Sequence, residues 1–303
     1  MKLPNLKHLH YLCMLHQEQH FHRAAEKCFV SQSTLSAAIQ NLEESLGQQL
    51  LEREHKTFVF TEFGEALVAK SKELLGQTHE WVEFAESAGD WQSGTLRLGV
   101  IPTIAPFMFE SLINQLQYEL PKIRLELHED TTDNLLARLH EGNLDALLLA
   151  LPMATPGCKQ ITLGQDPFHF IAHKDTPLNL QSKINIDEFP KDSIFLLQQE
   201  HCLSGHAISA CGLSHKEQVS AITASSLFTL VSLVNSKMGF TFVPEMALKS
   251  DILAGSDVVS YPLDDEAYRQ IGLVWRNGTT RSQLFFTVAH CIAPLLPKPH
   301  GLS

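Results

Sequence analysis

The sequence from Phe21 to Gly47 is FHRAAEKCFVSQSTLSAAIQNLEESLG, and it decides how the first part of the chain folds. Residues 21–28 form a short helical segment that Phe29 and Val30 interrupt. Ser31 is a favourable N-cap for a following helix, and Gly47 is a favourable stop. The apolar stripe of this helix consists of Leu35, Ile39, Leu42 and Leu46. An earlier helix is predicted from the same spacing, which recurs at Leu6, Leu9, Leu12 and Cys13.

The face opposite this stripe carries small or amide side chains, which reach base edges with little steric conflict. They are Gln32, Ser33, Ser36 and Gln40. A hairpin is predicted over residues 52–61, with Lys56 near its tip. Two helices joined by a short turn and followed by a hairpin are typical of a winged helix-turn-helix, here over residues 1–60. The residues predicted to contact DNA are Ser31, Gln32, Ser33, Thr34, Ser36 and Gln40 on the helix, and Arg53 and Lys56 in the wing, which touch phosphate.

Residues 61–92 are predicted to be a long helix followed by a linker. Leu67, Leu74 and Trp81 recur every seven residues, and Phe63, Thr78 and Ala85 lie one turn away. A narrow apolar seam of this kind needs a partner, which is either a second copy of the helix or the rest of its own domain. We expect the second copy, and therefore a homo-oligomer.

From residue 93 to residue 303 strand patterns alternate with helix patterns. Strands are predicted over 95–101, 124–128, 146–151, 168–172, 193–197, 240–243, 258–261 and 271–275. This alternation predicts an α/β domain with a mostly parallel sheet. We expect two subdomains, the first over residues 93–164 and 270–303 and the second over residues 165–269.

Composition restricts the class of protein without identifying it. The chain has 303 residues, of which 44% are hydrophobic and 19% charged, as in a globular protein. The net charge of -11 lies wholly after residue 60, because the first 60 residues hold equal numbers of basic and acidic side chains. The sequence contains neither an 18-residue apolar run nor an export signal, so we expect a cytoplasmic protein without membrane contact. The six cysteines should then be reduced.

The sequence from about residue 4 to residue 295 resembles the LysR-type transcriptional regulators. The motifs that carry the resemblance are Arg23-Ala24-Ala25, the run from Ser31 to Ser36, Gly142 to Asp145 and Gly239 to Pro244. The resemblance implies a regulatory domain like the periplasmic binding proteins, binding of promoter half-sites in double-stranded DNA, a dimer of dimers, and contact with RNA polymerase during gene activation. It implies neither an enzyme nor a cofactor or metal.

Within the family, the peroxide-sensing members are the most similar. The matching residues are Ile101-Pro102-Thr103, His128-Glu129 with Thr132, His201-Cys202, Cys211, and Arg269 ahead of Ile271-Gly272-Leu273-Val274. The resemblance implies that peroxide oxidises Cys202 to a sulfenic acid, which Cys211 converts to a disulfide. It also implies that Thr103, Thr132, His201 and Arg269 surround the thiol and the peroxide.

The spacing of the two cysteines has a structural consequence. Nine residues of helix span about 13.5 Å, whereas a disulfide needs Cα atoms about 4.4–6.8 Å apart. Any helix between Cys202 and Cys211 must therefore unwind when the bond forms.

Three alternatives remain open at this point. Cys202, His206, Cys211 and His215 have the spacing C-x3-H-x4-C-x3-H, which also suits zinc. A small metabolite between the two subdomains, near Thr103, Thr132 and Arg269, would make the cysteines incidental. A thiol peroxidase is the third reading, but it gives the helix-turn-helix no task. The remaining cysteines, Cys13, Cys28, Cys158 and Cys291, are expected to be buried apolar residues.

Overall fold

The structure, a computed structural model, describes residues 3–54, 57–86, 90–176, 189–198, 203, 205, 207, 217–263 and 267–297. The chain divides into two compact units. The first consists mainly of Met1–Ala88, and the second mainly of Gly89–Leu139 and Leu144–Ser303.

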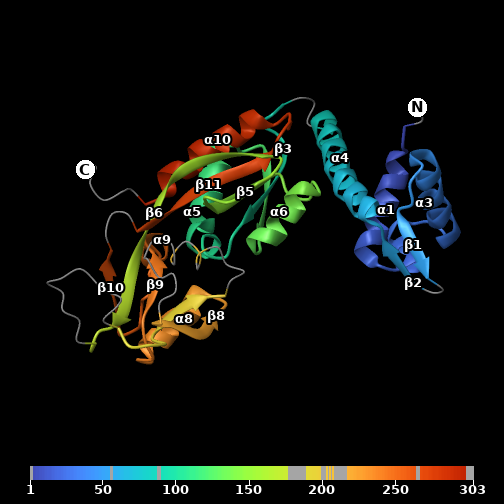
Figure 1. Ribbon diagram of the computed structural model, residues 1–303. Coiled ribbons are helices and arrows are strands. Elements are labelled where there is room, and N and C mark those ends of the chain that lie inside the picture. The colour runs from blue at the N-terminus through green and yellow to red at the C-terminus, as the bar shows by residue number, and fades with distance from the viewer. Residues whose placement is uncertain are drawn as a thin grey trace. The chain divides into compact units, whose positions relative to one another are not determined.

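The N-terminal unit is a winged helix-turn-helix followed by a long helix (Figure 1). Its elements are α1 (Leu6–Glu18), α2 (Phe21–Lys27), α3 (Gln32–Leu46), β1 (Leu51–Glu54), β2 (Thr57–Phe60) and α4 (Glu62–Glu86). The predicted helix boundaries of α3 are confirmed, because Ser31 is its N-cap and Gly47, with φ 65°, is its C-cap. The predicted stripe residues Leu35, Ile39 and Leu42 are buried in the core of this unit.

The long helix α4 is confirmed, but its seam is used only in part. Val68 is buried in the core of the N-terminal unit, and Leu67 packs against that core. Further along, Leu74 is 38% exposed and Trp81 is 61% exposed. The second half of the helix therefore presents apolar side chains to solvent.

The second unit is an α/β domain. Its elements are β3 (Gly94–Val100), α5 (Ala105–Glu119), β4 (Ile123–Glu129), α6 (Thr132–His140), β5 (Ala146–Leu151), β6 (Cys158–His173), β7 (Ile194–Leu197), β8 (Val219–Ala224), α8 (Leu227–Asn235), β9 (Thr241–Pro244), α9 (Glu245–Lys249), β10 (Val258–Pro262), β11 (Tyr268–Arg276), α10 (Ser282–Ile292) and the 3-10 turn η2 (Ala293–Leu295). The main sheet has the strand order β10-β6-β11-β5-β3-β4, with β9 also paired to β6. Helix α10 packs against β6 and β11 (Figure 1).

The prediction of a mostly parallel sheet is wrong. Strands β3, β4 and β5 are parallel, as are β7 and β8, but β11 is antiparallel to both β5 and β6, and β6 is antiparallel to β9 and β10. The reason is that β11 returns from the second half of the domain into the first sheet and inserts between β5 and β6. Strand β8 and the first half of β6 were not predicted from the sequence.

Two hydrophobic cores lie within this unit. One is built on β3, β5, β11, α5 and α10, and the other on the second half of β6 with β7, α8 and β9. The long strand β6 contributes to both, since Cys158 to Pro167 pair with β11 and Phe168 to His173 pair with β9 and β10. The subdomain boundaries predicted at 164/165 and 269/270 stay a prediction.

None of the helices in the described ranges is long and apolar enough to cross a membrane.

Candidate DNA-binding surface and candidate sensor site

The N-terminus of α3 presents the predicted base-contacting residues to solvent. Gln32 and Gln40 are exposed, and Ser36 is half-buried. Ser31 is exposed as well, but its hydroxyl accepts the N–H of Thr34 at 3.1 Å, so it caps the helix. The hydroxyls of Ser33 and Thr34 both bond to the Ser31 hydroxyl, at 2.8 and 2.7 Å. Gln32 and Gln40 thus have the longest side chains of the set whose polar groups make no hydrogen bond within the described residues.

The wing is fixed to α3 by the carboxylate of Glu43, a contact that was not predicted from the sequence. Glu43 Oε1 accepts the N–H groups of Leu50 at 2.9 Å and of Leu51 at 3.2 Å, at the start of β1. Arg53 lies in β1 opposite Phe58, and Lys56 is outside the described residues. The only sequence signal for the role of Glu43 was its place next to Leu42 of the apolar stripe.

Thr103 and Thr132 follow the carboxyl ends of two neighbouring parallel strands. Val100, at the end of β3, is paired with Glu129, at the end of β4. Thr103 is 3% exposed and Thr132, the first residue of α6, is 4% exposed. Ligands of open α/β sheets bind outside the carboxyl ends of the strands, so both residues stand where this fold places its binding sites.

Arg269 forms a buried ion pair with Asp166 of strand β6 and also hydrogen-bonds to Thr103. It is 1% exposed and lies in β11. Its Nε donates to Asp166 Oδ2 at 3.0 Å, and its Nη2 lies 2.9 Å from the same oxygen. The other hydrogen bonds go to Thr103, from Nη1 to the hydroxyl at 2.7 Å and from Nη2 to the carbonyl at 2.9 Å. We call Asp166, Arg269 and Thr103 the buried cluster.

The buried cluster determines what Thr103 can do. Because the Thr103 hydroxyl accepts from Arg269, its own proton remains for donation to another group. Asp166, which is completely buried, also accepts the N–H of Met246 at 3.0 Å. Burial raises the pKa of Asp166, while the Arg269 charge and the Met246 N–H oppose that rise. Arg269 therefore acts as a compensated charge and a rigid donor rather than as an isolated source of positive potential.

Asp166 is a site residue that sequence reasoning missed. It lies in β6, in the half of the strand that was not predicted. Its only sequence signal is an aspartate beside Pro167, within a segment of alternating polarity. Thr103 lies one residue before Ile104, the N-cap of α5, so it does not cap that helix.

The predicted redox residues His201, Cys202 and Cys211 lie outside the described residues, as do His206 and His215 of the zinc pattern. Three residues between the cysteines are described. Leu203, Gly205 and Ala207 are helical, and Leu203 and Ala207 are buried in the second core. In the part of the chain that the structure covers, no cluster of histidine, cysteine, aspartate or glutamate has the geometry to hold a metal.

The other four cysteines have thiols that stay protonated at neutral pH. Burial raises the pKa of Cys13 to about 11, and it also raises the pKa of Cys28, Cys158 and Cys291. None of the four forms a disulfide. Since the thiolate is the reactive form, these cysteines should react slowly with oxidants.

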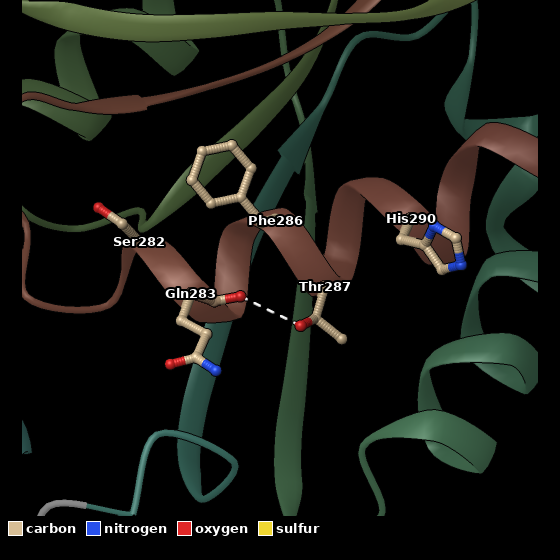
Figure 2. Close-up of a pocket in the computed structure, with 5 residues that line it drawn as sticks. All are labelled: Ser282, Gln283, Phe286, Thr287 and His290. Atoms are coloured by element: carbon tan, nitrogen blue, oxygen red, sulfur yellow. Dashed lines mark hydrogen bonds between the residues drawn. The ribbon is translucent and has the colours of Figure 1, made fainter.

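A pocket on the outer face of α10 lies apart from these residues. Figure 2 shows its lining, which is Ser282, Gln283, Phe286, Thr287 and His290, all on one face of the helix. The Thr287 hydroxyl donates to the Gln283 carbonyl at 3.1 Å, and Phe286 packs edge-on against Trp275. His290 is the single titratable side chain among the residues that line this pocket.

Comparison with known proteins assigns the chain to a family. A family model described as the LysR substrate binding domain matches residues 90–294, and one described as a bacterial regulatory helix-turn-helix protein of the lysR family matches residues 6–65. The HTH-type transcriptional regulator EstR of Acinetobacter baylyi is 36% identical, over 98% of this chain and 99% of EstR. The DNA-binding transcriptional dual regulator OxyR of Escherichia coli is 32% identical, over 95% of this chain and 94% of OxyR.

Two solved structures extend the comparison to the fold. The reduced regulatory domain of OxyR2 from Vibrio vulnificus is 42% identical with a TM-score of 0.65, and the match covers 68% of this chain and 97% of that chain. A variant of full-length OxyR from Pseudomonas aeruginosa is 30% identical with a TM-score of 0.74, over 96% of this chain and 95% of that one. The helix-turn-helix with its exposed α3, the α/β domain behind it and these matches agree: the chain belongs to the LysR family of DNA-binding transcriptional regulators.

Proposed function

We propose that this regulator senses hydrogen peroxide through Cys202 and Cys211. The Cys202 thiolate attacks one peroxide oxygen, the O–O bond breaks, and hydroxide leaves, which takes up a proton to become water. The resulting sulfenic acid is attacked by the Cys211 thiol, and a second water leaves as the disulfide forms. Two electrons pass from the two thiols to one peroxide molecule.

The observation that carries this proposal is the buried cluster at the carboxyl edge of the sheet. Peroxide chemistry needs a donor for the departing oxygen, and the Thr103 hydroxyl has its proton available because Arg269 occupies its acceptor side. Thr132 follows the adjacent strand, and we propose that it and His201 complete the surroundings of the thiol and the peroxide. The relatives named as hydrogen peroxide-inducible genes activators, at 30–33% identity, favour the same function.

A second candidate is a regulator that binds a small metabolite. Two observations favour it: the matching family model is described as substrate binding, and EstR, at 36%, is more similar in sequence than the OxyR of Escherichia coli, at 32%. The ligand would bind near Thr103, Thr132 and Arg269, and the cysteines would take no part in the response.

One experiment separates the two candidates. The purified protein receives a brief, low dose of peroxide, and mass spectrometry then maps the oxidised cysteines while footprinting follows the bound DNA. We expect a Cys202–Cys211 disulfide and a changed footprint in the wild type, no footprint change in Cys202→Ser, and a dimedone-labelled Cys202 in Cys211→Ser. Cys158→Ser is the matched control, because this half-buried thiol, whose pKa is raised by burial, should not be needed. A footprint that still changes with peroxide in Cys202→Ser would contradict the proposal. Zinc bound stoichiometrically, and lost with His206 or His215, would favour the zinc alternative instead.

The DNA contacts and the assembly complete the proposal. We propose that Ser31, Gln32, Ser33, Thr34, Ser36 and Gln40 present α3 to the major groove, and that Arg53 and Lys56 contact phosphate. Reading two half-sites requires two such units, and the exposed Leu74 and Trp81 of α4 favour a dimer through that helix. A dimer of dimers that contacts RNA polymerase is the arrangement we propose for gene activation. If Gln32→Ala leaves the site preference unchanged, α3 is not the recognition helix.

A further inference from the structure

The turn between α2 and α3 holds an aromatic residue whose ring is almost fully exposed in the described part of the chain. Phe29 is 95% exposed, the highest value among the large hydrophobic residues of the described chain. Its neighbours on both sides are at least half covered, since Cys28 and Val30 pack against the core of the N-terminal unit. The exposed ring is therefore not part of a general apolar surface in this turn.

The backbone makes a phenylalanine at this position unexpected. The N–H of Phe29 donates to the Glu26 carbonyl at 3.1 Å, and the N–H of Val30 donates to the Ala25 carbonyl at 3.0 Å. These two bonds form a Schellman motif at the end of α2, in which Phe29 takes the left-handed position with φ 55°. Glycine or asparagine is favoured there, because a bulky side chain strains the left-handed backbone. Phe29 thus combines backbone strain with the hydration of an aromatic ring.

Phe29 lies close to the end of α3 that is proposed to face DNA. Only Val30 separates it from Ser31, the N-cap of α3, so the Cα atoms of Phe29 and Ser31 lie no more than about 7.6 Å apart. Ser33 and Gln32, just beyond the cap, are exposed on the same end of the helix. A duplex that meets the N-terminus of α3 therefore lies within reach of the ring. A phenylalanine ring donates no hydrogen bond, and the apolar group that base pairs present in the major groove is the C5-methyl of thymine.

We infer that Phe29 packs against a thymine methyl group in the major groove beside the α3 contacts, as an apolar reader of the DNA sequence. The inference rests on the proposed role of α3 as the recognition helix. It adds a specificity residue from the turn to the polar residues already proposed.

The test uses the full-length protein and a duplex that the wild type selects from a randomised pool. Each thymine is replaced in turn by deoxyuridine, which lacks only the methyl group. For the wild type we expect one thymine at which the replacement weakens binding about four-fold, which corresponds to ~0.8 kcal/mol for one buried methyl. Phe29→Asn should bind the unmodified duplex at least four-fold more weakly and should be insensitive to deoxyuridine at that thymine. Its unfolding temperature should equal or exceed that of the wild type, because asparagine accepts the left-handed backbone.

Gln19→Gly is the matched control. Among the described residues of this unit, Gln19 is the other exposed non-glycine residue with a left-handed backbone, φ 48°, and it ends α1 rather than preceding α3. This variant should keep the affinity and deoxyuridine sensitivity of the wild type.

Three outcomes would overturn the inference. They are an unchanged affinity in Phe29→Asn, a weaker affinity without coupling to any thymine, and reduced transcription with normal DNA binding, which would assign the ring to a protein partner. Gln32→Ala distinguishes failure of this inference from failure of the proposed function. If Gln32→Ala changes the DNA site preference, α3 is still the recognition helix, even when the Phe29 variant gives one of these three outcomes.

Discussion

Removing one member of the buried Asp166–Arg269 ion pair should strongly destabilise the second unit, the α/β domain. Asp166 and Arg269 have 0% side-chain exposure, so solvent does not screen the charge that remains when its partner is lost. Asp166→Ala leaves the guanidinium without its carboxylate and the Met246 N–H without its acceptor. Breaking a buried pair in this way costs about 3–5 kcal/mol. For a unit of this size, that should lower the midpoint of thermal unfolding by roughly 6–20 °C.

The assay is scanning calorimetry of the full chain, supported by urea unfolding followed by circular dichroism. A double variant, Asp166→Leu with Arg269→Met, tests the origin of the effect, because replacing both charges by apolar groups of similar size is often neutral or stabilising. Its stability should exceed that of Asp166→Ala. Lys174 and Asp257 form a matched exposed pair at 2.8 Å. Breaking that pair with Asp257→Ala should barely change the midpoint, because solvent screens it.

Two results would refute this reasoning. One such result is a free energy of unfolding for Asp166→Ala within about 1 kcal/mol of the wild-type value, which is less than breaking a buried pair should cost. The unpaired Arg269 charge would then not be buried as the structure indicates. If the apolar double variant is as unstable as the single one, the loss comes from packing rather than from an unpaired charge.

Three further predictions concern other parts of the chain. Glu43→Ala should cost about 1–3 kcal/mol, because it leaves the Leu50 and Leu51 N–H groups without an acceptor, and it should weaken DNA binding, measured by fluorescence anisotropy. Trp81→Lys should reduce self-association in analytical ultracentrifugation and lower specific DNA affinity with it; a wild-type monomer at micromolar concentration would contradict this. Burial raises the pKa of Cys13 to about 11, so the contribution of the protonated thiol to folding stability is fully present below pH 9 and should fall by roughly 2–3 kcal/mol as the pH rises through 11. Urea unfolding at pH 8 and pH 11 should show this loss in the wild type and a smaller one in Cys13→Ala.

The elements with a strong local pattern were predictable from sequence. The stripe of α3, its serine cap and its glycine stop act within a few residues of one another, so the helix follows from Ser31 to Gly47 alone. The strand of six buried residues from Ala146 to Leu151 was predicted with its observed ends for the same reason.

The features that depend on distant pairing were not predictable. The direction of β11 relative to β5 follows from where the chain re-enters the sheet, and no local pattern encodes that path. Asp166 and Arg269 are 103 residues apart, and Arg269 and Thr103 are 166 apart. Resemblance to a family could suggest Thr103 and Arg269, but only the register of β6 against β11, in which Asp166 stands opposite Arg269, brings the carboxylate to the guanidinium.

Arg269 and Phe29 both break the ordinary rule of burial, in opposite directions, and the comparison separates two kinds of exception. A buried arginine is rare unless it is paired, and Asp166 and Thr103 supply that pairing within the chain. An exposed phenylalanine is unremarkable alone, but Phe29 also has a left-handed backbone that glycine or asparagine would adopt with less strain. No contact within the described residues compensates that strain, because the ring is almost wholly in solvent. Departures from local preference are expected at functional sites. For Arg269 the compensation is internal, and for Phe29 we propose that it comes from DNA bound beside α3.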